Sequence, residues 1–407
     1  MIQNIVIVGA GQAASQAIHT LRHRGYSGSI SLVGEEPYLP YQRPPLSKKY
    51  LAGQLARERL SIRPQHFYDD HSVVTRLGRR AEAIDRSGQN VRLDDASTLP
   101  YDALLLATGS TPRKLTAPGA QLEGVHVLRT IADVDGIRAH AGAGRRLVIV
   151  GGGYIGLEVA AIGRELNMDV TVLEMADRVM NRVVCSPISL FYQAEHARHG
   201  VKIVLHARVQ AIAADATGSR ARAVVCEDGS EYPADIVLVG VGVIPADALA
   251  LNGGIECNNG IVVDEYCRTS DPNIYAAGDC TNHPSLRYDR RLRLESVDNA
   301  FEQGASAALN MLGMPTVHDK VPWFWSDQYD IKLIIVGLCQ GHDSVITRGD
   351  PATRSFSACY LRDGELIAVD TVNHPKDQMA ARKLVAMRIK PNVEKLGHSE
   401  IPLKDCV

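Results

Sequence analysis

The sequence predicts an α/β fold in which one strand–turn–helix–strand unit occurs twice. The first copy has apolar, largely β-branched runs at residues 4–8 and 30–33, and the second has them at 147–150 and 170–173. A glycine-rich turn and a helical pattern separate the two runs of each copy. Strands that alternate with helices in this way are typical of parallel sheets covered by helices. From about residue 320 the pattern changes and predicts an α+β C-terminal domain.

Length and composition are those of a globular protein. The 407 residues correspond to two or three domains. A net charge of -2, from 44 basic and 46 acidic residues, provides no overall positive field for nucleic acid. No apolar run approaches the roughly 18 residues of a membrane helix, and no basic residues precede the first strand as in a secretory signal. We therefore expect a cytoplasmic protein that binds neither nucleic acid nor a membrane.

Neither the cysteines nor the histidines predict a metal site. The eight cysteines include no Cys-x-x-Cys pair, so we expect buried, reduced thiols. His19 and His23 lie four residues apart, and His196 and His199 lie three apart. Neither pair has the glutamate that follows the first histidine of a zinc-protease helix. We expect both pairs to be polar side chains on helix surfaces, and no metal.

The glycine-rich turn of the first copy reads Gly-Ala-Gly-Gln-Ala-Ala from Gly9. Gly9 permits the tight turn, Gly11 lets the backbone approach a pyrophosphate, and the small Ala14 allows the helix to pack closely on the strand. The helix N-terminus then faces the negative charge of the phosphates. Glu35 or Glu36, after the second strand, can accept a hydrogen bond from a ribose hydroxyl.

The turn of the second copy carries the full Gly-x-Gly-x-x-Gly pattern at Gly151, Gly153 and Gly156. Glu174 follows its second strand. A carboxylate there binds the ribose 2′-hydroxyl and repels a 2′-phosphate, which predicts NADH rather than NADPH. Arg178 and Arg182 lie nearby, and either could instead reach a phosphate. Two copies in their complete context predict two Rossmann-like domains that bind two dinucleotides.

Three further strands end where the backbone could approach a cofactor. One leads into Ala107, Thr108 and Gly109, and another ends at Gly242. Taken alone, each of these strand ends is more often a simple tight turn. A third leads to Asp279, whose carboxylate could bind a sugar hydroxyl or face water at a turn.

Five further motifs, together with these turns, carry a resemblance to a known family. They are, in chain order, Pro40–Lys48, Gly152–Glu158, Ala277–Cys280, Arg293–Val297 and Val321–Gln328. Over nearly its whole length, the chain resembles the two-dinucleotide flavoproteins of glutathione reductase architecture. Within them it is most similar to the ferredoxin reductase branch of putidaredoxin reductases and dioxygenase ferredoxin reductases.

The resemblance implies an FAD-dependent NADH:ferredoxin oxidoreductase. Such an enzyme takes a hydride from NADH to FAD and passes single electrons to a [2Fe–2S] ferredoxin. The ferredoxin then serves a haem-thiolate monooxygenase or a Rieske-type dioxygenase. Rubredoxin reductase, or an NADH-sensing flavoprotein scaffold resembling apoptosis-inducing factor, is the alternative.

The resemblance also implies the residues that bind the two cofactors. Those assigned to FAD are Gly9, Gly11, Ala13, Ala14, Glu35, Arg43, Lys48, Ala107, Thr108, Gly109, Asp279, Val297 and Trp325. Those assigned to NADH are Gly151, Gly153, Tyr154, Ile155, Gly156, Glu174 and Gly242. In this assignment Asp279 binds the ribityl chain, Val297 approaches the pyrimidine end of the flavin, and Trp325 lies close to the ring. One departure is Ala246, where relatives commonly have asparagine, so a polar contact from this position is in doubt.

Lys48 and Glu158 are the predicted catalytic pair. Hydride arrival leaves the reduced flavin negatively charged, and a fixed cation such as Lys48 would stabilise it. Two prolines before Lys48 stiffen this segment, and Glu158 could hold the lysine in place. A structural salt bridge with no role in turnover is the alternative. Residues 38–51 contain no cysteine. This excludes the local redox disulfide that the disulfide reductases of the same superfamily use.

Residues 286–295 hold four arginines and two acids. They are predicted to form a docking patch for an acidic ferredoxin, with a solvated loop as an equal alternative. The arginines of this patch are Arg287, Arg290, Arg291 and Arg293.

The order of the motifs predicts three domains. The Asp279 motif follows the second copy, so the NAD-binding domain, 112–246, is inserted into a discontinuous FAD-binding domain, 1–111 and 247–319. Residues 320–407 form the C-terminal domain. We expect the protein to be a monomer.

Overall fold

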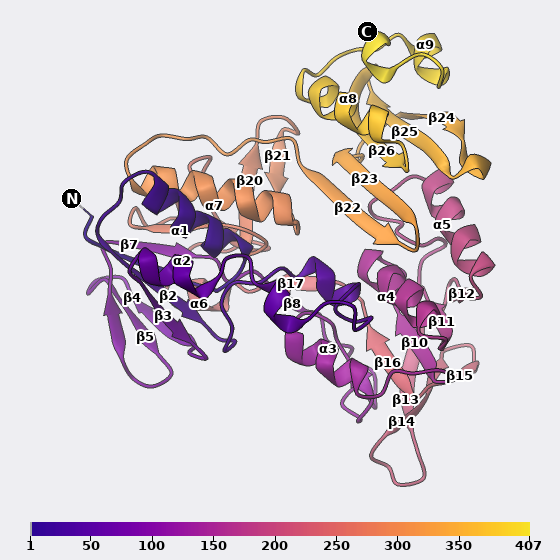
Figure 1. Ribbon diagram of the computed structural model, residues 1–407, viewed down its shortest axis with the longest axis horizontal. Helices are drawn as coiled ribbons and strands as arrows, with labels where there is room; N and C mark the ends of the chain where they lie inside the picture. Colours follow the sequence, from indigo (N-terminus) through magenta and orange to yellow (C-terminus); the bar gives the residue numbers. More distant parts are fainter. Residues whose placement is uncertain (1) are drawn as a thin grey trace. The chain divides into compact units, whose positions relative to one another are not determined.

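The computed structural model describes residues 2–407, which form two compact units (Figure 1). The first unit contains the residues up to Gln42 together with Arg57–Thr111 and Val243–Lys320. The second contains Arg43–Ala56, Pro112–Gly242 and Val321–Val407. The division into three domains stays a prediction. It differs from this grouping because it separates the NAD-binding domain from the C-terminal domain and places Arg43–Ala56 in the FAD-binding domain.

The central sheet of the first unit has five parallel strands in the order β19-β7-β1-β2-β3. Their bounds are Asn4–Val8 for β1, Ser29–Gly34 for β2, Val73–Leu77 for β3, Ala103–Leu106 for β7 and Ile274–Ala276 for β19. Alternate side chains of β1 point to opposite faces. Ile5 and Ile7 pack against helices α1 (Gln12–His23) and α7 (Val297–Met311), whereas Val6 and Val8 belong to the core on the other face.

Helices α1 and α7 lie side by side although they come from opposite ends of this unit's sequence (Figure 1). Gly304 permits the close approach, because a Cβ there would lie 2.5 Å from the backbone oxygen of Ala13. The other elements of this unit are η2 (Arg57–Leu60), α2 (Gln65–Asp70), β4 (Ala81–Asp85), β5 (Asn90–Leu93), β6 (Thr98–Pro100), β17 (Val243–Pro245), α6 (Ala248–Asn252), β18 (Ile261–Val262), β20 (Thr281–Ser285) and β21 (Arg290–Leu292), with β8 (Ser110–Pro112) at its boundary.

A second parallel sheet, in the order β12-β11-β10-β16-β9, forms the core of the second unit. Its strands are β9 (Val125–His126), β10 (Arg146–Val150), β11 (Asp169–Leu173), β12 (Lys202–Val204) and β16 (Ile236–Val239). Helix α4 (Tyr154–Glu165) packs closely on this sheet, because a Cβ at Gly163 would lie only 2.9 Å from the Val170 side chain. Around the sheet lie η1 (Pro44–Ser47), α3 (Ile131–Arg138), α5 (Ser186–Arg198), β13 (Val209–Ala214), β14 (Ala221–Cys226) and β15 (Glu231–Pro233).

The C-terminal part of the second unit is an antiparallel sheet in the order β22-β23-β26-β25-β24. Its strands are β22 (Trp323–Gln328), β23 (Ile331–Gly337), β24 (Ser344–Asp350), β25 (Ser355–Arg362) and β26 (Glu365–Val372). Around the sheet lie η3 (Pro351–Thr353), α8 (Pro375–Ala386), α9 (Val393–Gly397) and η4 (Leu403–Asp405). Leu384 and Val385 of α8 share a core with Ile334 and Val336 of β23.

A buried arginine connects the C-terminal segment to this sheet through hydrogen bonds and an ion pair. The Arg348 side chain of β24 is 1% exposed and forms an ion pair with Asp377 at 3.1 Å. Its Nη1 donates to the carbonyl oxygen of Leu396 at 2.6 Å, and its Nη2 to that of Ile401 at 2.7 Å. The C-terminal segment is thus held by the guanidinium group of one strand residue.

The predicted fold class is confirmed: an α/β chain with two Rossmann-like parallel sheets and an α+β C-terminal region. In the part of the chain that is described, no helix is long and apolar enough to cross a membrane. Residues 286–295 include one strand of the antiparallel β20–β21 hairpin, so the predicted alternative of a plain loop describes only part of them.

Candidate functional site

The first glycine turn leaves open space in front of a helix N-terminus. Gly9 has a φ of +108°, and a Cβ there would lie 2.1 Å from the Ala107 oxygen, so only glycine fits. A Cβ at Gly11 would meet no atom within 4 Å. Helix α1 begins after Gly11 without a capping side chain and without an acid in its first turn. Its backbone N–H groups are therefore suited to the pyrophosphate of a dinucleotide.

The second turn repeats this geometry at the start of α4. Gly151 has a φ of +111°, and a Cβ there would lie 2.5 Å from the Gly240 oxygen. A Cβ at Gly156 would lie 2.3 Å from the Gly151 oxygen, whereas one at Gly153 would meet nothing within 4 Å. No side chain caps α4, and its first turn has no acid. The second turn therefore fits a second dinucleotide in the same way.

The acid of the second copy is held against its turn. Glu174 accepts from the backbone N–H of Gly152 at 2.6 Å through Oε2 and from that of Ala176 at 2.8 Å through Oε1. Arg178 donates to the carbonyl oxygens of Val184 and Asn181 and to the hydroxyl group of Ser189. The Arg178 guanidinium is thus engaged in local contacts, which leaves Arg182 as the nearby arginine with an exposed side chain.

In the first unit, the residues assigned to FAD gather at the carboxyl ends of neighbouring strands. Gly9 follows β1, Thr108 follows β7 and Asp279 follows β19, and these strands are adjacent in the sheet. Ligands of open α/β sheets bind at this edge. Ser110 donates to Asp279 at 2.9 Å, and the hydroxyl group of Thr108 donates to the Ala246 oxygen at 2.6 Å.

Of the two acids after β2, Glu36 accepts a hydrogen bond from Tyr41 at 2.7 Å, whereas Glu35 is exposed. Gln303 of α7 supports the turn before Asp279, because its Oε1 accepts from the Gly278 N–H at 2.8 Å. The sequence analysis missed Gln303, and only its position on the helix after the Asp279 motif could have indicated it. Val297 is the first residue of α7, directly after the capping residue Ser296.

Lys48 and Glu158 form a largely buried ion pair in the second unit. The Nζ of Lys48 lies 2.6 Å from Oε2 of Glu158, and the side chains are 17% and 5% exposed. Ser47 donates to the same carboxylate oxygen at 2.5 Å, and Ser326 of β22 donates to Oε1 at 2.7 Å. Lys48 also donates to the carbonyl oxygen of Pro44 at 3.3 Å. The predicted pair therefore exists, and the two serines, which the sequence analysis missed, complete it.

Two further residues assigned to FAD, Arg43 and Trp325, also belong to the second unit. Trp325 lies beside Trp323, with ring centroids 5.3 Å apart. Arg43 donates to the carbonyl oxygen of Arg129 at 2.6 Å. Their assignment to the flavin stays a prediction.

The proposed docking arginines differ in their local contacts. Arg291 donates to Asn282 at 3.0 Å and to the Val263 oxygen at 2.7 Å, and Arg293 pairs with Glu295 at 2.5 Å. Arg290 and Arg291, both on β21, are exposed, whereas Arg287 and Arg293 are half-buried. Among these four side chains, those of Arg290 and Arg291 are therefore the most accessible to a partner.

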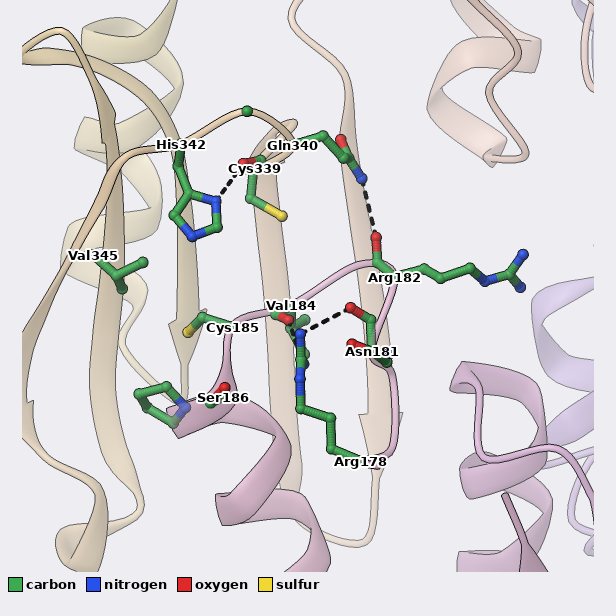
Figure 2. A pocket seen from close by; sticks show the side chains of 12 residues that line it. Arg178, Asn181, Arg182, Val184, Cys185, Ser186, Cys339, Gln340, His342 and Val345 are labelled. Atoms are coloured by element: carbon green, nitrogen blue, oxygen red, sulfur yellow. Dashed lines mark hydrogen bonds between the residues drawn. The ribbon is translucent and has the colours of Figure 1, made fainter. Parts of the chain in front are cut away.

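A cavity of about 460 Å³ lies between the segment before α5 and the turn after β23 (Figure 2). Cys185 and Cys339 line it, and Gln340 donates to the Arg182 oxygen across it at 3.1 Å. Burial raises the pKa of Cys339 to about 12 and also raises the pKa of Cys185. Both are therefore protonated at neutral pH and are poor nucleophiles.

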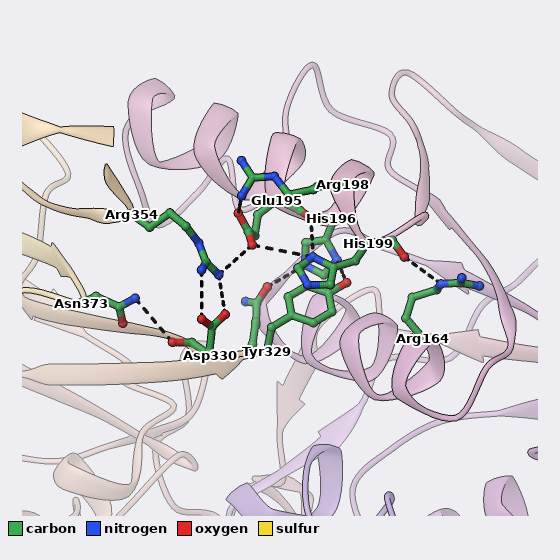
Figure 3. A network of polar contacts seen from close by, with 10 residues as sticks. Arg164, Glu195, His196, Arg198, His199, Tyr329, Asp330, Arg354 and Asn373 are labelled. Carbon is green, nitrogen blue, oxygen red and sulfur yellow. Dashed lines mark hydrogen bonds and ion pairs between the residues drawn. The ribbon is translucent and has the colours of Figure 1, made fainter. Parts of the chain in front are cut away.

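His196 corrects one expectation, because it is fully buried and not on a helix surface. Its Nε2 lies 2.8 Å from Oε1 of Gln328, and its Nδ1 lies 3.0 Å from the hydroxyl group of Tyr329. Figure 3 shows this network, in which α5 meets the turn between β22 and β23. Burial lowers the pKa of His196 to about 4, so the ring is neutral at pH 7. The sequence showed no sign of this packing because the two segments lie far apart along the chain.

Comparison with known proteins defines the class of this protein. The family model described as "Pyridine nucleotide-disulphide oxidoreductase" matches residues 3–304, and that described as "Reductase C-terminal" matches residues 323–407. The chain therefore belongs to the pyridine nucleotide-disulphide oxidoreductase family. The predicted oxidoreductase class and the cofactors FAD and NAD(H) are confirmed by this membership.

Individual relatives match over nearly their whole length. Putidaredoxin reductase CamA of Pseudomonas putida is 42% identical over 407 residues, which cover 99% of this chain and 96% of that protein. The 5,5'-dehydrodivanillate O-demethylase ferredoxin reductase subunit of a Sphingobium species is also 42% identical, with 98% and 97% covered. The solved covalent putidaredoxin reductase–putidaredoxin complex superimposes with a TM-score of 0.96 at 42% identity, covering 99% of this chain and 98% of that chain. The predicted resemblance to ferredoxin reductases is thus confirmed.

Proposed function

We propose that this protein transfers electrons from NADH through FAD to a [2Fe–2S] ferredoxin, which serves a haem-thiolate monooxygenase or a Rieske-type dioxygenase. The observation that carries the proposal is the pair of open, uncapped glycine turns, one in each parallel sheet. Two such turns suit two dinucleotides, and the relatives that match over the full length include a reductase solved in complex with putidaredoxin.

Bound FAD supplies the conversion of a hydride into single electrons. The chain's own residues bind and orient the cofactors. The N-termini of α1 and α4 bind the pyrophosphates, and Asp279 accepts from a sugar hydroxyl. Lys48 places a positive charge where negative charge develops, and Glu158 holds the lysine in position.

Glu174 supports a preference for NADH. Its carboxylate is fixed beside the second turn by two backbone N–H groups, so it would repel a 2′-phosphate. Arg178 cannot relieve this repulsion without giving up its contacts to Val184, Asn181 and Ser189.

We also propose that the protein is a cytoplasmic monomer with the three-domain division described above. The hairpin that carries Arg290 is the proposed docking face for the ferredoxin.

The test is the rate of NADH-driven cytochrome c reduction with and without an added [2Fe–2S] ferredoxin, repeated with NADPH. We expect a large ferredoxin-dependent gain with NADH and little rate with NADPH. No gain with several [2Fe–2S] ferredoxins would contradict the proposed partner. Equal rates with NADPH would contradict the role of Glu174.

A further inference from the structure

A chain of hydrogen bonds runs through the interior of the second unit and ends on Glu158. Ser326 lies 2.7 Å from Oε1 of Glu158, and Nε2 of Gln328 lies 3.1 Å from the Ser326 hydroxyl oxygen. Oε1 of Gln328 in turn lies 2.8 Å from Nε2 of His196, whose Nδ1 lies 3.0 Å from the Tyr329 hydroxyl group. Ser326, Gln328 and His196 are at most 1% exposed. The chain thus links α5 through β22 to the carboxylate that holds Lys48.

Elementary chemistry gives this chain one direction. An ionised Glu158 can only accept, so the single proton of the Ser326 hydroxyl group points to it. Ser326 must then accept from the amide nitrogen of Gln328, which turns the amide oxygen toward His196. His196 therefore carries its proton on Nε2, and its Nδ1 accepts from Tyr329. Every donor in the chain points toward Glu158.

Such an arrangement has a physical consequence for the carboxylate. Hydrogen bonds to the charged form of an acid favour that form, which opposes the penalty of burying the charge. Serine and glutamine at alternate positions of one strand, Ser326 and Gln328, face the same side. They therefore provide a continuous donor path that a hydrophobic interior would not.

We propose that His196 is a positioning residue for the Lys48–Glu158 pair, because its Nε2–H orients Gln328 and Ser326 so that they donate to Glu158. The His196 ring contacts neither Lys48 nor Glu158 and acts only through the two intervening side chains. The proposal deepens the proposed function and rests on it, because the pair matters to turnover only if Lys48 stabilises the reduced flavin.

The first experiment reads the direction of the chain without using activity. The holoenzyme is prepared with ¹⁵N-labelled histidine, and the His196 resonances are assigned by their loss in His196→Asn. We expect an Nε2 that bears the proton and a bare Nδ1. In Glu158→Gln the amide can either donate or accept, so we expect a measurable change in the tautomer ratio of His196. A proton on Nδ1 in the unmodified protein, or a ratio unaffected by Glu158→Gln, would overturn the proposal.

The second experiment measures coupling by a double-mutant cycle on the rate of flavin reduction by NADH. Gln328→Met preserves the approximate size of the side chain and removes both hydrogen bonds. We expect it to slow reduction about fivefold, as for loss of one hydrogen bond between neutral groups. The same change made in Glu158→Gln should have little further effect, since the anion is already absent. Additive effects would contradict the proposal.

Arg354→Met is the matched control. Arg354 forms ion pairs with Glu195 of α5, at 2.9 Å, and with Asp330, so it joins the same segments without entering the donor chain. We expect this variant to lower the melting temperature but to keep the His196 tautomer and the reduction rate. A tautomer that changes equally in Arg354→Met would show that general packing, not the donor chain, sets it.

The two possible failures can be told apart with Lys48→Met. If Lys48→Met reduces flavin at the rate of the unmodified protein, the proposed role of the pair is wrong whatever the tautomer. If Lys48→Met is slow but Gln328→Met and His196→Asn are not, the pair acts without His196. If Gln328→Met fails to fold, His196→Asn takes its place in the cycle.

Discussion

Two carboxylates of this protein, those of Glu174 and Asp370, lie in opposite environments. Glu174 accepts hydrogen bonds from two backbone N–H groups at the second glycine turn. Asp370, on β26, is fully buried, and its Oδ1 has no hydrogen-bond partner among the described residues. Burial raises the pKa of Asp370, so the charged form of this carboxyl group is destabilised.

Replacement of Glu174 by serine should reduce the preference for NADH. The variant loses the ribose acceptor and the charge that repels a 2′-phosphate, so we expect kcat/KM for NADH to fall about tenfold and that for NADPH to rise. Steady-state kinetics with both coenzymes measure this ratio. An unchanged ratio of the two kcat/KM values would show that another group binds the ribose. Arg182→Gln in the same background would test whether the exposed arginine contributes to NADPH binding.

Asp370 should make stability depend on pH. Burial raises its pKa from 3.8 to about 8, so the folded state holds a proton that the unfolded state releases above pH 4. Stability is therefore lost as pH rises from about 4 to 8, at up to about 1.4 kcal/mol per pH unit. The hydroxyl group of Tyr360 donates to Oδ2 of Asp370. Asp370→Asn removes the pH dependence, and its amide oxygen can still accept from Tyr360. Urea unfolding should show the variant to be the more stable protein at pH 8 and the difference to shrink at pH 5; a constant difference would contradict the assignment.

At the scale of elements, the two strand–turn–helix units follow from the sequence because each step is local. Glycine positions and apolar runs predicted β1, α1, β10 and α4 to within a few residues. The β20–β21 hairpin and the burial of His196 were not predictable in this way. Both depend on segments that meet in space, and charged or polar composition alone does not indicate what covers a side chain.

Two glycines of the second turn should respond differently to alanine. A Cβ at Gly156 would lie 2.3 Å from the Gly151 oxygen, whereas one at Gly153 would enter open space. We expect Gly156→Ala to push α4 away from β10 and to lower the melting temperature by several degrees. Gly153→Ala should leave the melting temperature nearly unchanged but raise the KM for NADH, because the methyl group fills the space for the pyrophosphate. Equal melting temperatures for the two variants would contradict this account.

At the scale of the whole molecule, the chain combines two Rossmann-like sheets with a C-terminal region that supplies Ser326 and Gln328 to the Glu158 network. Motif order predicted the two sheets and the α+β region, and the relatives match all of them over nearly the full chain. The donor chain was beyond sequence analysis, because its residues come from segments more than a hundred positions apart.

Electron transfer from this protein to ferredoxin should depend on ionic strength and on Arg290. If an acidic ferredoxin docks at the hairpin, Arg290→Glu should raise the KM for ferredoxin severalfold, and added salt should raise it in the unmodified protein. The rate of ferricyanide reduction by NADH serves as the control, because it needs no docked protein and should not change. A ferredoxin KM insensitive to both would place the docking face elsewhere.

The contacts of the buried Arg348 guanidinium with the C-terminal segment, here called the Arg348 clamp, have a practical consequence for handling the protein. One guanidinium group binds the carbonyl oxygens of Leu396 and Ile401 and the carboxylate of Asp377. Removal of the segment after residue 395 would leave this cation paired with Asp377 but without its two carbonyl acceptors, which would destabilise the fold. An affinity tag added beyond Val407, which is exposed, leaves the clamp intact. Carboxypeptidase digestion of the folded protein should accordingly stall within the last few residues, where the backbone becomes tied to β24.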